Sequence, residues 1–250
     1  MSKTIKPFTG FSEGLFHFLN NLSQNNNNEW FNENKQDYQN NLIDPAKSFI
    51  TELAPFINRL NPAIRTEPKF NKTILRMNKD LRFNKDTPYR NYFLIHFGRF
   101  KMDSEFFIYF EKDEIQIGLF INNSTKSEFL FNRNLKKFKE EIISSFRKFN
   151  LNNKYSLYEL KNGPQKLITK FDAQKHFSKI ENAKHLLLQK VISPRKSKVF
   201  SQEFIIESIR IFSSLYPIYI FSISDNPLKE IKKIIEEFDE LCFTQKSSFK

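Results

Sequence analysis

Apolar side chains recur every three or four residues through the first sixty positions, a spacing that is typical of one buried helix face. Residues 15–22 form the first such stripe, and Ser12 lies where a helix cap is expected. Asp44 followed by proline indicates a further helix start, and Pro55 predicts a kink because proline has no backbone N–H. The predicted helices cover residues 12–24, 29–42 and 44–60.

The pattern changes to short aromatic and β-branched runs between residues 73 and 120, which is typical of strands. Two of these runs flank the polar residues 111–114, as the two strands of a hairpin do. Helical spacing then returns, interrupted by two further extended runs. The predicted strands are 73–77, 92–97, 105–110, 115–120, 155–160 and 186–192, and the predicted helices are 127–149, 172–184, 201–212 and 226–243.

No Gly/Ser-rich linker and no internal repeat divides the chain, so a single domain over residues 1–250 is predicted. Helices at both ends and strands in the middle favour an α+β fold. We expect a mainly antiparallel sheet with the N-terminal and C-terminal helices packed on it. A chain of this length buries roughly 70% of the surface that its unfolded form exposes, so it needs neither a metal nor a disulfide for stability.

The apolar runs are too short to predict a membrane protein. The longest, Leu215–Ile223, contains Pro217 and Ser222 and falls short of the roughly 18 residues that a membrane helix requires. The first residues lack the apolar core of a secretory signal, and the single Cys242 cannot form an internal disulfide. We therefore expect a cytoplasmic protein that does not bind membranes.

Forty basic and 28 acidic residues give a formal net charge of +12 and a pI near 9.6. Clustered basic residues bind phosphate backbones, so a nucleic-acid-binding module is one interpretation. The lysines are spread along the whole chain, and residues of A/T-rich codons dominate the composition, which favours a solvated basic surface. The five glycines form no phosphate-binding motif, which excludes P-loop and dinucleotide-binding proteins.

The densest mixture of Arg, Lys, Asp and Asn lies at residues 69–90. Alternate residues of an extended chain share a face, so Arg76, Asp80 and Arg82 are expected on one side. Two guanidinium groups on one surface clamp a phosphate or carboxylate, with Asp80 as orienting group or general base. This predicts an anionic small molecule as ligand. In the alternative interpretation, the same charges pair internally and hold a loop to the sheet of a protein-interaction scaffold.

This segment also carries a resemblance. Residues 76–90, R-M-N-K-D-L-R-F-N-K-D-T-P-Y-R, resemble the signature R-x-x-R-D-x-R-F-S-K-D-K-T-P-Y-K of a bacterial family of conserved hypothetical proteins, domain of unknown function 2461. Residues 27–31, N-N-E-W-F, resemble a second element of that family, and the whole resemblance covers about residues 8–220. The chain departs from the signature at Lys79, at Asn84 and after Asp86, where one residue is missing. The family has no assigned activity, so the resemblance implies a fold and no reaction.

Two further residues complete the candidate site. Trp30 either fills the core or borders a ligand cleft. His96 is the only histidine near the motif in sequence, where it is either a hydrogen-bonded strand residue or a proton-transfer partner for Asp80. No histidine or cysteine spacing indicates a metal site, and no cofactor is predicted. The predicted catalytic residues are Asp80 and His96, and the predicted ligand-binding residues are Trp30, Arg76, Lys79, Arg82, Lys85, Asp86, Tyr89 and Arg90.

Overall fold

The computed structural model describes residues 6–79 and 87–246, with side chains described up to residue 236. The N-terminal part is helical, as predicted. Its helices are α1 (Glu13–Gln24), α2 (Asn28–Glu33), α3 (Lys35–Tyr38), the π-helical turn η1 (Gln39–Ile43) and α4 (Asp44–Leu60). Helix α4 begins at Asp44, as predicted, but Asp44 does not cap it, because Ile43 and Asp44 both have helical backbone angles and η1 runs directly into α4. Pro55 is exposed inside α4, which continues to Leu60.

A six-stranded sheet occupies the middle of the described chain. All its neighbouring strands pair antiparallel, in the order β1-β2-β3-β6-β4-β5. The strands are β1 (Phe93–Phe97), β2 (Glu105–Phe110), β3 (Ile115–Asn122), β4 (Ser156–Leu160), β5 (Pro164–Ile168) and β6 (His185–Ile192). The α+β class is therefore confirmed, as is the hairpin of β2 and β3.

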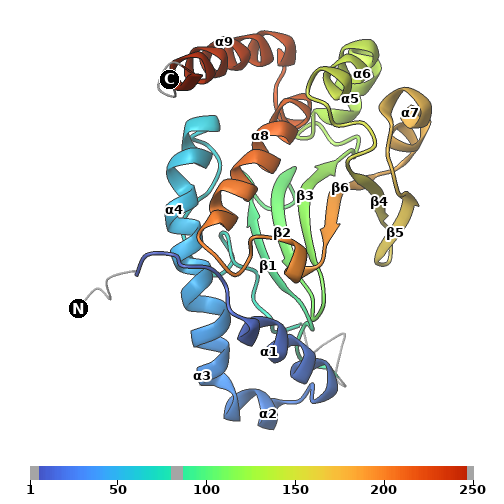
Figure 1. Ribbon diagram of the computed structural model, residues 1–250. Helices are drawn as coiled ribbons and strands as arrows, with labels where there is room; N and C mark the ends of the chain where they lie inside the picture. Colours follow the sequence, from blue (N-terminus) through green and yellow to red (C-terminus); the bar gives the residue numbers. More distant parts are fainter. Residues whose placement is uncertain (1–5, 80–86, 247–250) are drawn as a thin grey trace.

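The two faces of the sheet differ in what covers them. Side chains alternate between faces along a strand, and Phe93 and Phe97 of β1 are fully buried while His96 is partly exposed. Phe97 packs on Phe212 with ring centroids 6.1 Å apart, so the buried face is the one that α8 (Glu203–Ile223) crosses (Figure 1). We call the opposite face the His96 face.

Helix α8 is 21 residues long, and by length and composition alone it is apolar enough to cross a membrane. The sequence-based reason for excluding a span was wrong, because Pro217 lies within this helix and does not interrupt it. However, 67% of its most apolar 18-residue stretch is buried inside the fold. Phe212 and Tyr219 lie about 5 Å from the ring of Phe106 in β2, which is the packing of a core helix.

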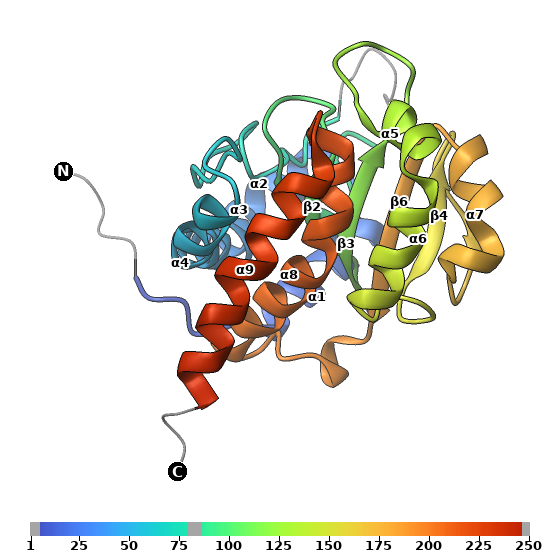
Figure 2. The same ribbon diagram turned by 90° about the horizontal axis from the view of Figure 1, so that it is seen from above.

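The remaining helices flank the sheet and α8. They are α5 (Phe131–Lys137), α6 (Lys139–Lys148), α7 (Ala173–Asn182), the 3₁₀ turn η2 (Pro194–Lys196) and α9 (Pro227–Lys246). The helix predicted over 127–149 is two helices, because the backbone leaves the helical region at Phe138. Helix α9 lies against the outer side of α8 (Figure 2). The strand predicted at 73–77 is reduced to two isolated bridges of Ile74, one with Phe70 and one with Ile95.

Candidate functional site

The structure describes two short segments of the candidate motif, residues 76–79 and 87–90, and these two segments pair with each other. The Lys79 N–H donates to Pro88 O over 2.8 Å, and the Arg90 N–H donates to Met77 O over 2.7 Å. Asn78 and Tyr89 form an antiparallel bridge between these bonds. Four predicted site residues fall between the two segments and lie outside the described residues: Asp80, Arg82, Lys85 and Asp86.

Arg90 binds the backbone of the facing segment. Its Nη1 donates to Arg76 O over 2.8 Å and also to Asn78 O. Carbonyl oxygens are good acceptors for a guanidinium, which has five donors and no acceptor. The Arg90 side chain therefore holds the backbone of residues 76–78 in place.

Tyr89 joins this paired segment to α2. Its ring stacks on Phe31 with centroids 4.0 Å apart and planes at 8°, and its Oη donates to Asn28 Oδ1 over 3.1 Å. The Asn26 side chain donates to Tyr89 O and accepts from Tyr89 N–H, each over 2.9 Å. The two segments that carry the family resemblance therefore contact each other directly.

Trp30 belongs to the same aromatic group but not to its centre. It is half-buried, with its ring 5.4 Å from Phe18, and its backbone N–H donates to Asn27 Oδ1 at the start of α2. Phe18 also packs on Tyr38 at 5.8 Å. Trp30 thus supports the group of aromatic side chains against which Tyr89 packs.

Arg76 lies on the surface beside this aromatic group. Its side chain is exposed, and its Cζ lies 5.7 Å from the centroid of the Phe70 ring. Burial raises the pKa of the Tyr38 hydroxyl, and the positive charge of Arg76 partly opposes this rise, so the two groups are close enough to interact. Among the described residues, no carboxylate lies within 4 Å of the Arg76 guanidinium.

Lys79 is the second cation of the paired segments. Its Nζ donates to Thr87 Oγ1 over 2.9 Å, across the pair. A lysine ammonium has three donors, so this bond leaves two of them for other acceptors.

His96 lies in a different environment from Arg76. Its Nδ1 is 2.8 Å from Glu105 Oε2 on β2, and its backbone N–H donates to Thr73 O. His96 therefore forms a histidine–carboxylate pair on the His96 face, while Arg76 sits beside Tyr38 of α3. No hydrogen bond or ion pair joins the His96 side chain to the paired segments 76–79 and 87–90. The sequence analysis missed Glu105, whose signal is its position as the single acidic residue in the aromatic run 105–110.

A pocket of about 720 Å³ lies near the start of α4. Lys6, Lys47 and Lys69 line it together with one carboxylate, Asp44, which accepts a hydrogen bond from Gln39. Lys69 directly precedes Phe70, the ring under Arg76. These lysines come from three separate segments, so no local sequence pattern identifies them.

The described residues contain no group of three or more His, Cys, Asp and Glu side chains that could hold a metal ion. A comparison with curated proteins gives no match. The family model of a conserved hypothetical protein, DUF2461, matches residues 14–221. This range contains the paired segments, α2, the entire sheet and nearly all of α8, and it ends before α9. The chain therefore belongs to the family of conserved hypothetical proteins called domain of unknown function 2461.

Proposed function

We propose that the surface around Arg76 binds a small anionic molecule, with the Arg76 guanidinium as a direct ligand. The observation that carries this proposal is an exposed guanidinium over an aromatic ring, with no carboxylate within 4 Å among the described residues. A guanidinium binds phosphate or carboxylate through two parallel N–H donors.

The backbone that carries Arg76 is held from both sides. The Leu75 N–H donates to Leu94 O of β1 over 3.1 Å, and Arg76 O accepts from Arg90. A ligand-binding group on a fixed backbone loses less freedom on binding, which raises affinity. Arg90 is thus a positioning residue in this proposal.

The surrounding charge favours an anion over a cation. Among the described residues the Lys79 ammonium has one hydrogen-bond acceptor, Thr87, and Lys69 brings a further positive charge next to Phe70. The roles predicted for Asp80 as general base and for Arg82 as second guanidinium belong to this proposal as well. The same holds for the ligand-binding roles of Lys85 and Asp86.

A thermal-unfolding experiment tests the role of Arg76. We expect phosphate, pyrophosphate or citrate at about 100 times its dissociation constant to add about 2.7 kcal/mol, which raises the Tm by roughly 5 to 10 °C. The Arg76→Gln protein should lose this rise while keeping the Tm of the ligand-free wild type within about 2 °C. The matched control is Arg195→Gln, which removes an exposed arginine on η2 and should keep the full rise.

An equal rise in all three proteins would show that Arg76 is not a ligand. A short RNA or DNA strand in the same series tests the nucleic-acid alternative. Binding that is confined to the oligonucleotide and weakens steeply with salt would favour that alternative over a small-molecule site.

A further inference from the structure

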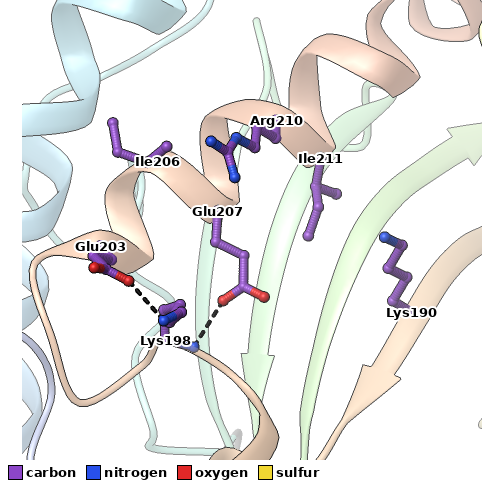
Figure 3. A pocket seen from close by; sticks show the side chains of 7 residues that line it. All are labelled: Lys190, Lys198, Glu203, Ile206, Glu207, Arg210 and Ile211. Atoms are coloured by element: carbon purple, nitrogen blue, oxygen red, sulfur yellow. Dashed lines mark hydrogen bonds and ion pairs between the residues drawn. The ribbon is translucent and has the colours of Figure 1, made fainter.

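A second pocket, of about 570 Å³, lies between β6 and the first turns of α8 (Figure 3). Its volume is within the range of small-molecule sites, roughly 300–1,000 Å³. It is formed by Lys190 of β6, the segment after η2 and one side of α8, and it shares no lining residue with the Arg76 surface. The lining residues are Lys190, Lys198, Glu203, Ile206, Glu207, Arg210 and Ile211.

The two carboxylates of this pocket are both engaged by Lys198. Glu203 Oε2 lies 2.8 Å from Lys198 Nζ, and Glu207 Oε2 accepts the Lys198 backbone N–H over 2.9 Å. Both contacts are drawn in Figure 3, where they gather on one side of the pocket. The acidic groups therefore have partners within the protein.

The two cations opposite, Lys190 and Arg210, have no such partner. Among the described residues, no carboxylate lies within 4 Å of either group. Figure 3 shows Lys190 rising from β6 and Arg210 on α8, on opposite sides of Ile211, with the Arg210 guanidinium above Glu207. Glu207 also faces this space and attracts Lys190, but from beyond ion-pair distance.

The ammonium of Lys190 is partly buried and lies near both a second lysine, Lys154, and Glu207. The ammonium lies 5.3 Å from the centroid of the Tyr155 ring, and the Tyr155 hydroxyl is hydrogen-bonded to Ser214 over 2.9 Å. Partial burial lowers the pKa of Lys190, and the charge of Lys154 lowers it further. A half-buried ammonium beside a second lysine is unfavourable on its own, and a bound anion offsets that penalty.

The pocket also has an apolar side. Ile211 is buried at its base, and Ile206 is 48% exposed at its rim. Such isoleucines contribute to ligand binding through apolar contact rather than through charge. The ligand that fits these surroundings has an anionic head and an aliphatic body.

We propose that this pocket binds a small aliphatic carboxylate, whose head group contacts Lys190 and Arg210 and whose chain lies on Ile211 and Ile206. Lys198 does not contact the ligand in this arrangement, because its ammonium is paired with Glu203 and its backbone N–H donates to Glu207. The site is independent of the function proposed for Arg76.

Octanoate, octanol and octylamine are the probes for this site, with binding measured by calorimetry on the full chain. We expect octanoate to bind, and octanol and octylamine to bind at least about tenfold more weakly, a difference of 1.4 kcal/mol or more. Lys190→Met keeps an unbranched side chain without its charge, and Arg210→Gln changes an exposed residue. Each variant should weaken octanoate binding by about tenfold or more. Lys229→Met, an exposed change on α9, should leave it unchanged.

Three results would overturn the proposal. The first is equal octanoate affinity in the wild type, Lys190→Met and Arg210→Gln. The second is octanol binding as tight as octanoate binding, and the third is a wild type that does not bind octanoate at millimolar concentration. The ligand-free Tm of Lys190→Met should equal or slightly exceed that of the wild type, which separates a lost site from a lost fold.

Discussion

Replacing Tyr89 with alanine is expected to lower the free energy of unfolding by about 3–5 kcal/mol, the usual loss for a buried aromatic residue. Tyr89 is 5% exposed, and its ring covers Phe31 at 4.0 Å. Its removal opens a cavity between α2 and the paired segments and leaves Asn28 without its hydrogen-bond donor. Chemical denaturation monitored by circular dichroism measures this change through the midpoint and slope.

Tyr89→Phe is the matched control, because it keeps the stacking and removes only the hydroxyl. Its expected loss is about 0.5–1.5 kcal/mol, the net contribution of one hydrogen bond. If Tyr89→Ala destabilised the protein no more than Tyr89→Phe does, the contact between Tyr89 and α2 would not hold the candidate site.

Gly118→Ala is expected to destabilise the protein by about 3 kcal/mol or more, at the upper end for a change that adds atoms to a filled core. Gly118 lies in the middle of β3, opposite Phe107 of β2 and Gln189 of β6. A Cβ at this position would lie 2.1 Å from Leu188 O and 2.7 Å from Gln189 Cα. Both atoms belong to the backbone, so β3 and β6 would have to separate to accept a methyl group.

Gln116→Ala is the control for this prediction, because Gln116 lies on the same strand and face two residues earlier. It loses hydrogen bonds to Gln189 and Glu114, and we expect a loss of about 1 kcal/mol. A Gly118→Ala protein as stable as the wild type in thermal and chemical unfolding would mean that β3 and β6 do not pair in this register.

The hydrophobic pattern predicted the elements whose burial alternates strongly. α1 has five buried side chains on one face, and the β2–β3 hairpin alternates around a polar turn. β5 was missed because its first three residues are exposed, so no apolar period marks them. The break at Phe138 was missed because apolar residues of α5 and α6 continue one stripe across it. Periodicity therefore indicates which side is buried more reliably than where a helix ends.

The candidate site was only partly accessible to sequence reasoning. The motif drew attention to Arg76 and Arg90 but did not separate their environments. Arg90 binds backbone carbonyl oxygens, and every residue has one. The residue types in the sequence therefore do not identify its partners. The Glu105 partner of His96 is fixed by strand register between β1 and β2, which the sequence does not state. Lys190 and Arg210 line the same pocket only because α8 folds over β6.

The most direct test of the Arg76 site follows the side-chain Nε–Hε resonance of Arg76 by NMR during titration with phosphate, pyrophosphate and citrate. The spectrum of Arg76→Lys assigns the peak, and the Arg195 resonance is the internal control. With at least one anion, we expect a saturable shift of the Arg76 resonance with the dissociation constant found by thermal unfolding, while Arg195 stays in place. A stationary Arg76 resonance with all three anions would contradict the proposed anion site.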